Sequence, residues 1–140
     1  MSQLDSGSKR KVLVVDDDPQ IRRILERMLV GSSYEVRTAG DGLAALNQVK
    51  EDPPDLVILD IMMPGMSGIE VCRQIREANP GHPIQVLMLS AKDSQADRRR
   101  ALEYGANDYV TKPFHIASLV RKIQYMFEKQ GSERASSHFE

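Results

Sequence analysis

Short apolar runs alternate with helical patterns along most of the chain. Three runs have little polar alternation, as is typical of strands buried on both faces of a parallel sheet; they are Lys11–Val15, Asp55–Leu59 and Ile84–Leu89. Tyr34–Thr38 and Asn107–Val110 are weaker strand candidates. The pattern predicts a strand followed by a helix five times, and right-handed crossovers then require a parallel sheet with helices on both faces. The expected fold is α/β, a doubly wound sheet of five parallel strands with five helices.

The predicted helices have recognisable first and last residues. Asp18 suits the N-cap of the first helix, and Pro19 suits its first helical position. Ser67 and Ser94 resemble the first residues of capping boxes for two further helices, and Gly105 resembles the glycine that ends one of them. These signals place the helices between the apolar runs.

Both ends of the chain lack apolar periodicity. Residues 1–9 and 130–140 consist largely of small and polar side chains. We expect a disordered or tag-like N-terminus over residues 1–9, one domain over residues 10–129, and a C-terminal tail or linker over residues 130–140. Residues 130–140 could instead continue the last helix toward a further domain.

Charge and cysteine content exclude several classes of function. The 19 Lys and Arg residues nearly balance 20 Asp and Glu residues, which gives no support for bulk attraction to nucleic acid or acidic lipid. The single Cys72 excludes an intrachain disulfide and a multi-cysteine zinc site, and indicates a reducing compartment. No apolar run approaches the roughly 20 residues that cross a bilayer, and the N-terminus lacks the apolar core of a signal peptide. We expect a cytoplasmic domain that binds neither membrane nor nucleic acid directly.

Polar side chains follow the predicted strands at the points where the strands end. Asp16 and Asp17 follow the first strand, Asp60 follows the third, Ser90 ends the fourth and Lys112 follows the fifth. The carboxyl ends of parallel strands meet at one edge of the sheet, where ligands bind. Neighbouring carboxylates repel one another unless a cation or a proton relieves them. Oxygen ligands without nearby His or Cys favour a hard cation, Mg²⁺ before any transition metal.

This set of side chains fits transfer of a phosphoryl group to a carboxylate. One aspartate would be the nucleophile, the metal would offset charge, and the lysine and serine would contact the phosphoryl oxygens. Taken singly, each residue also has a structural explanation. Asp18 is more readily a helix cap than a ligand, and Lys112 alone would be an ordinary surface lysine. The joint occurrence is what favours the functional interpretation.

Four segments, in this order and at this spacing, carry a family resemblance. They are Val12–Pro19, Asp60–Gly68, Leu89–Ala91 and Gly105–Phe114. They resemble the receiver domain of two-component response regulators, over about residues 10–129. The resemblance implies a flavodoxin-like fold with strand order 2-1-3-4-5, like that of the chemotaxis regulator.

The resemblance also implies roles for the residues at the strand ends. Asp60 would accept the phosphoryl group and form an aspartyl phosphate. Asp16 and Asp17 would bind Mg²⁺, directly or through water, together with Asp60 and the backbone carbonyl of Met62. Lys112 would contact the phosphoryl group. No organic cofactor is implied.

A second set of implied roles concerns the switch. Ser90 would move to hydrogen-bond the phosphoryl group, and Tyr109 would turn inward as Ser90 moves. The Lys112–Pro113 peptide bond would be cis. The surface that responds would be formed by the fourth helix, the fifth strand and the fifth helix, about residues 94–127.

The implied function is a phosphorylation-controlled signalling switch rather than a metabolic enzyme. Its only catalysis would be to accept the phosphoryl group and later to hydrolyse it. A sensor histidine kinase or a phosphotransfer protein would supply the group, and an effector domain or output protein would respond. A homodimer through the responding surface is left open: Arg98, Asp108 and Lys122 lie where one subfamily pairs charges across a dimer, whereas Ser118 replaces its usual Glu.

Two alternatives compete with this interpretation. A pseudo-receiver would be a binding module without phosphorylation, but all the acidic, hydroxyl and lysine residues named above are present. A phosphatase of the haloacid dehalogenase type also forms an aspartyl phosphate on a parallel sheet, and residues 16–18 superficially offer its Asp-x-Asp motif. That family has Thr or Val where this chain has Gln20, and it needs more chain for a cap domain and a second acidic motif.

Overall fold

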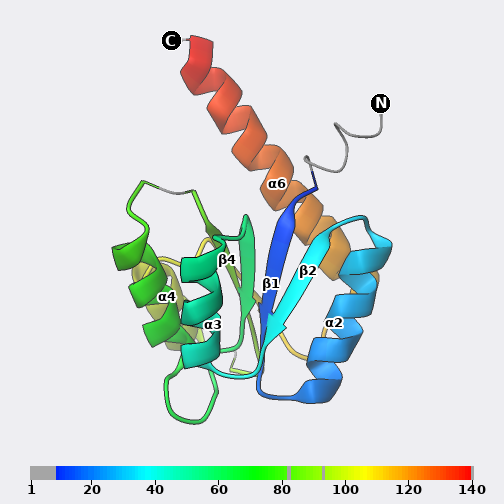
Figure 1. The fold of residues 1–140 in the computed structure, drawn as a ribbon, viewed down its shortest axis with the longest axis vertical. Helices are drawn as coiled ribbons and strands as arrows, with labels where there is room; N and C mark the ends of the chain where they lie inside the picture. Colours follow the sequence, from blue (N-terminus) through cyan, green and yellow to red (C-terminus); the bar gives the residue numbers. More distant parts are fainter. Residues whose placement is uncertain (1–8, 82, 93, 140) are drawn as a thin grey trace.

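A computed structural model describes residues 9–81, 83–92 and 94–139, with side chains as far as residue 130. Five strands and five helices alternate in this part of the chain (Figure 1): β1 (Lys11–Val15), α2 (Pro19–Gly31), β2 (Glu35–Ala39), α3 (Gly42–Glu51), β3 (Leu56–Leu59), α4 (Gly68–Ala78), β4 (Gln85–Ser90), α5 (Gln95–Glu103), β5 (Asp108–Thr111) and α6 (Ile116–Phe139). Of the N-terminal segment predicted to be disordered, residues 1–8 lie outside the described part.

The five strands form one parallel sheet in the order β2-β1-β3-β4-β5. The predicted flavodoxin-like topology is therefore confirmed. Val15 at the end of β1 lies opposite both Ala39 of β2 and Leu59 of β3. Because these strands end at the same level, the residues that follow β1 and β3 emerge side by side at the carboxyl edge, which faces down in Figure 1.

The sheet separates two hydrophobic layers. Side chains of α3, α4 and α5 cover one face, and side chains of α2 and α6 cover the other. The strands β1, β3 and β4 are almost completely buried, as their continuous apolar sequences predict. Cys72 is packed into the first layer, where its thiol donates to the carbonyl oxygen of Tyr104 at 3.4 Å. Burial raises the pKa of this thiol to about 11, so Cys72 is a packed and unreactive thiol.

The helices begin at the predicted caps. The side chain of Asp18 accepts a hydrogen bond from the N–H of Gln20, the second residue of α2. Ser67 and Ser94 accept from backbone N–H groups in the first turns of α4 and α5. Gly105 follows α5 with φ +113°, a conformation that favours glycine. Asp41 caps α3 in the same way, although its sequence context had not singled it out.

The backbone of α6 is helical from Ile116 to Phe139, and its last turns project beyond the edge of the sheet where β1 begins (Figure 1). No break in the helix marks the predicted domain boundary at residue 129. The helical backbone does not decide between a tail or linker and a continuation toward a further domain, and both stay predictions. Within the described residues, no helix combines the length and the apolar character that a bilayer span requires.

Gly68 lets α4 begin in direct contact with the backbone that follows β3. Its N–H donates to the carbonyl oxygen of Ile61 at 2.9 Å. A Cβ atom at this position would lie 2.0 Å from the carbonyl oxygen of Asp60 and 2.9 Å from the Cα atom of Ile61. Only glycine therefore permits this close approach, which fixes the backbone carrying Asp60.

We expect Gly68→Ala to lower the free energy of unfolding by about 3 kcal/mol or more, because backbone atoms must move to admit the methyl group. Gly31→Ala is the matched control: no atom lies within 4 Å of its added Cβ, and alanine in a helix is more favourable than glycine by about 1 kcal/mol. Urea denaturation of both variants measures the difference. A Gly68→Ala protein as stable as the parent would contradict the close approach.

Candidate functional site

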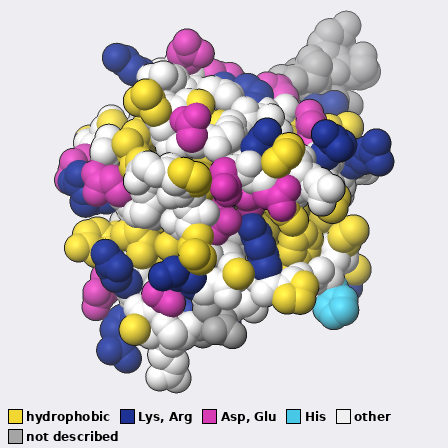
Figure 2. Space-filling model, turned by 90° about the horizontal axis from the view of Figure 1, so that it is seen from below, with side chains coloured by type: hydrophobic (Ala, Val, Ile, Leu, Met, Phe, Trp, Pro, Cys, Tyr) yellow, Lys and Arg dark blue, Asp and Glu magenta, His cyan; other side chains and the backbone are white. Residues whose placement is uncertain are grey.

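The candidate site lies at the carboxyl edge of the sheet, where backbone hydrogen bonds continue past the strand ends. The N–H of Asp16 donates to Ala39 at 3.2 Å, that of Asp60 donates to Val15 at 3.1 Å, and that of Lys112 donates to Ser90 at 2.9 Å. These bonds continue the hydrogen-bond ladder of the sheet to the first residue after β1, β3 and β5. Figure 2 views this edge and shows a central group of acidic side chains with a basic side chain beside it.

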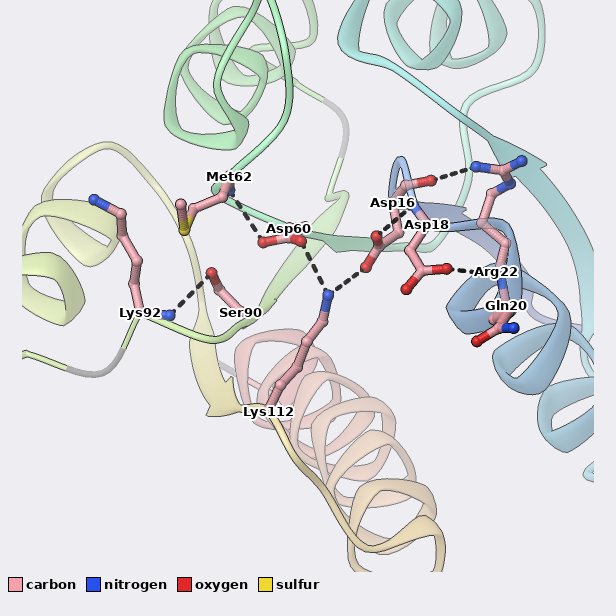
Figure 3. A network of polar contacts seen from close by, with 9 residues as sticks. All are labelled: Asp16, Asp18, Gln20, Arg22, Asp60, Met62, Ser90, Lys92 and Lys112. Atoms are coloured by element: carbon pink, nitrogen blue, oxygen red, sulfur yellow. Dashed lines mark hydrogen bonds and ion pairs between the residues drawn. The ribbon is translucent and has the colours of Figure 1, made fainter.

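Lys112 joins the two buried aspartates. Its Nζ lies 2.6 Å from Oδ2 of Asp16 and 3.0 Å from Oδ2 of Asp60, and Figure 3 shows it pointing between the two carboxylates. Asp16 is 2% exposed and Asp60 is 7% exposed. Charges with so little access to water need a partner of opposite charge, and the lysine is that partner for both.

The remaining carboxylate oxygens accept backbone hydrogen bonds. Oδ1 of Asp16 accepts from the N–H of Asp18 at 3.0 Å, and Oδ1 of Asp60 accepts from the N–H of Met62 at 3.1 Å (Figure 3). Each carboxylate is therefore held at both oxygens. This fixes the direction in which Asp60 presents its lone pairs.

Burial and pairing act in opposite directions on the charges of this site. Burial raises the pKa of Asp16, and the hydrogen bonds from Lys112 and from the Asp18 backbone offset that rise only in part. For Lys112, burial opposes the charge, but the bonds to Asp16 and Asp60 together outweigh it and raise the pKa of the lysine. Two carboxylates thus share one cation, so the lysine is firmly charged while Asp16 remains short of positive charge.

Asp16, Asp17 and Asp60 fit a divalent cation. One carboxylate oxygen from each lies within 4.8 Å of the others. Mg²⁺ binds oxygen ligands at about 2.1 Å, so opposite ligands stand about 4.2 Å apart, and small movements of these side chains would complete such a set. Asp17 is exposed, which leaves an open side for water ligands. A donor set of oxygens alone favours Mg²⁺ over softer metals.

Met62 is placed beside the site by its backbone. Its side chain is 54% exposed, and its N–H contacts Asp60 as described above. This arrangement is compatible with the expected contribution from its carbonyl oxygen, which stays a prediction.

Ser90 and Tyr109 meet at the segment that follows β4. The Ser90 side chain is completely buried, and its Oγ accepts from the N–H of Lys92 at 3.4 Å. The Tyr109 hydroxyl donates to the carbonyl oxygen of the same Lys92. The guanidinium of Arg98 lies 5.2 Å from the centre of the tyrosine ring. Burial raises the pKa of Tyr109.

The tyrosine ring is already turned inward in this structure, since Tyr109 is 7% exposed. The sequence led us to expect an inward turn only after Ser90 moves. The structure brings the two residues together at Lys92, and their coupling stays a prediction. The expected cis peptide bond between Lys112 and Pro113 is confirmed.

The charges expected at a dimer contact make a bond within the chain. Nζ of Lys122 on α6 lies 3.0 Å from Oδ2 of Asp108 on β5. The guanidinium of Arg98 packs over the ring of Tyr109 in the same chain. The homodimer therefore stays a prediction.

Two supporting residues were missed from the sequence. Gly68 allows the close approach of α4 to Asp60, and Arg22 donates from Nη1 to the carbonyl oxygen of Asp16 at 2.6 Å (Figure 3). In the sequence, Gly68 stands out only as the end of a motif, and Arg22 is not singled out. Neither has a local sequence signal for its contact, because the contact joins separate segments.

The comparisons with known proteins agree with this geometry. Residues 12–124 match the family described as the response regulator receiver domain. The chemotaxis protein CheY4 of Vibrio cholerae is 32% identical over 84% of this chain and 98% of its own, with a TM-score of 0.80. A putative response regulator from Chloroflexus aurantiacus is 36% identical over 84% of this chain and 97% of its own, with a TM-score of 0.76.

A longer protein matches in the same way. NtrX from Brucella abortus is 29% identical over 94% of this chain, with a TM-score of 0.86, but the match covers 30% of the NtrX chain. Taken with the parallel sheet and the acidic pocket at its carboxyl edge, the family match shows that this chain belongs to the response regulator receiver domains of two-component signalling.

Proposed function

We propose that this receiver domain is a signalling switch controlled by phosphorylation of Asp60. The observation that carries the proposal is the carboxylate of Asp60, which is held by the Met62 N–H and by Lys112 beside two further aspartates. The carboxylate is oriented, slightly open to solvent, and surrounded by groups that can offset the charge of a phosphoryl group. Asp16 has the same lysine and a backbone donor of its own, but Asp60 stands at the acceptor position of the receiver-domain motif and is the more exposed of the two, at 7% against 2%.

In the proposed reaction, a carboxylate oxygen of Asp60 attacks the phosphorus of a phosphohistidine in a histidine kinase or phosphotransfer protein. An O–P bond forms, the N–P bond breaks, and the imidazole of the donor leaves with the electron pair and takes up a proton. Lys112 exchanges its contact with the Asp60 carboxylate for one with a phosphoryl oxygen, and the Ser90 hydroxyl donates to another. Mg²⁺ bound at Asp16, Asp17, Asp60 and the Met62 carbonyl would supply a Lewis acid that offsets charge on the phosphoryl oxygens.

The added group changes the balance of charge at Lys112 and Ser90. A phosphoryl group brings close to two negative charges and three acceptor oxygens. Because Ser90 Oγ and the Tyr109 hydroxyl both contact Lys92, movement of Ser90 would be felt by the tyrosine and by the segment leading into α5. We place the output on the surface of α5, β5 and α6, about residues 94–127.

The partners that we propose follow from this assignment. A histidine kinase or phosphotransfer protein of the cytoplasm supplies the phosphoryl group, and an effector domain or a separate output protein binds the α5–β5–α6 surface. The match to part of the longer Brucella abortus NtrX is compatible with an effector domain, and the matches over 98% and 97% of shorter chains are compatible with a separate output protein. Catalysis is limited to accepting the phosphoryl group and hydrolysing it.

We expect Asp60→Asn to abolish Mg²⁺-dependent labelling by phosphoramidate or acetyl phosphate, because the amide lacks the anionic nucleophile. Asp18→Asn is the matched control, since asparagine caps a helix as well as aspartate does and Asp18 is outside the oxygen cluster. Mass spectrometry of the intact protein counts the added phosphoryl groups. Stoichiometric, hydroxylamine-labile labelling of Asp60→Asn would place the acceptor elsewhere.

We expect Mg²⁺ to raise the melting temperature of the parent by mass action, with about 1.4 kcal/mol gained when its concentration is tenfold above the dissociation constant. Asp17→Asn should lose most of this gain, and without metal it should melt at or above the parent because a repulsive charge is gone. Asp18→Asn should keep the full response. An unchanged Mg²⁺ response in Asp17→Asn would remove Asp17 from the metal site.

We expect Ser90→Ala to be phosphorylated at Asp60 but to transmit less of the change to residues 94–127. Backbone amide NMR with and without beryllofluoride, a phosphoryl analogue, measures the response. Ser90→Thr keeps the hydroxyl and should keep the parent's shift pattern. If Ser90→Ala shows the parent's full pattern across these residues, the relay through Ser90 is wrong.

A further inference from the structure

Arg22 reaches back from the first turn of α2 to the loop that carries the acidic pair. Its Nη1 donates to the carbonyl oxygen of Asp16 at 2.6 Å, and its own N–H donates to the carbonyl oxygen of Asp18 at 3.1 Å. Figure 3 shows the guanidinium beside the Asp16 backbone, on the side away from Lys112. The side chain is half-buried. It therefore holds the backbone of the loop and leaves the carboxylates to other partners.

The guanidinium also packs against the loop between β2 and α3. A Cβ atom on Gly40 would lie 3.2 Å from Nη1 of Arg22 and 3.6 Å from its Cζ, so the guanidinium rests directly on the backbone of Gly40. Contact on this side limits the positions open to the arginine. The contact with Gly40 therefore helps to keep the guanidinium beside the carbonyl oxygen of Asp16.

The Asp16 carbonyl belongs to the peptide group that joins Asp16 to Asp17. The N–H of Asp16 is already fixed on Ala39, so a bond to the Asp16 carbonyl fixes the plane of the next peptide. That plane sets the position of the Asp17 Cα atom, from which its side chain projects. Among the described residues, the Asp17 carboxylate has no hydrogen bond or ion pair of its own. Its direction therefore depends on the backbone that Arg22 holds.

Taken with the proposed function, on which this step rests, we infer that Arg22 is a positioning residue for metal binding: by holding the Asp16 carbonyl, it orients the Asp17 carboxylate toward the cation. Arg22 bonds to a carbonyl oxygen, so it does not compete for the carboxylates as Lys112 does. Groups that orient metal ligands in this way typically change metal affinity by about 10- to 100-fold.

If Arg22 acts only through its charge, its removal should raise the affinity for Mg²⁺, and if it acts by positioning the loop, its removal should lower that affinity. Loss of a positive charge near three carboxylates would, by Coulomb attraction alone, tighten binding of a cation. Loss of the hydrogen bond would free the peptide plane and weaken binding. The sign of the change in affinity therefore separates a positioning residue from a nearby charge.

The experiment uses three variants of the full chain. Arg22→Met keeps an unbranched stem against Gly40 and removes both the charge and the donor, whereas Arg22→Lys keeps a charge and a donor. Arg23→Met is the matched control, because Arg23 is exposed and lies one residue further along the same helix. For Arg22→Met we expect a dissociation constant for Mg²⁺ about tenfold above the parent's, measured by NMR titration of the loop amides. Arg22→Lys should stay within about threefold of the parent, and Arg23→Met should bind Mg²⁺ as tightly as the parent or more tightly.

A second measurement needs no metal. The amide of Asp18 donates to Oδ1 of Asp16, and loosening the loop should speed its hydrogen exchange by about tenfold in Arg22→Met but not in Arg23→Met. If the parent binds no Mg²⁺, the proposed function fails while this measurement still tests whether Arg22 holds the loop. Unchanged exchange, or Mg²⁺ binding in Arg22→Met as tight as the parent's, would overturn the inference. So would an Arg22→Lys protein as weak as Arg22→Met.

Discussion

The ion pairs that Lys112 makes with Asp16 and Asp60 join segments 96 and 52 residues apart in sequence. Two nearly buried carboxylates at the end of an apolar sheet would be strongly unfavourable without a cation. The parallel sheet brings all three groups together because β1, β3 and β5 end at the same edge. Lys112 is the positive charge that the protein itself provides to these carboxylates. It leaves the acidic cluster with a deficit of positive charge that a divalent ion can fill.

The same interaction explains why the site can respond to a new anion. Lys112 is shared between two acceptors, so a phosphoryl group on Asp60 competes for a partner that is already present and oriented. The backbone around the lysine does not need to be rebuilt. Ser90 ends β4 and Tyr109 lies on β5, so under the proposed function these two residues lie between the lysine's contacts and the surface of α5, β5 and α6.

Much of the architecture could be predicted from local sequence. Continuous apolar runs identified the buried strands, and Asp18, Ser67 and Ser94 marked helix starts, because both signals depend on neighbouring residues. The residues that make up the site could be predicted from the order of the strands, because residues that follow parallel strands lie at the same edge of the sheet. The double contact of Lys112 and the inward position of Tyr109 could not be predicted, because each depends on distances between segments far apart in the chain.

Because helix α6 is long and packs on the sheet only along its first half, a small tilt at the sheet would become a larger displacement at its far end. Its 24 residues correspond to a rod of about 36 Å, and its first half packs on the sheet while its last turns project past the edge opposite the acidic cluster (Figure 1). A tilt of about 5° about the middle of the packed half, which is about 26 Å from the far end, would carry that end through about 2 Å. The packed half of the helix is joined to β4 by the Gln85 bond to the Met126 carbonyl and to β5 by the Lys122–Asp108 pair, so a rearrangement of these contacts too small to disturb the core would displace the far end of the helix.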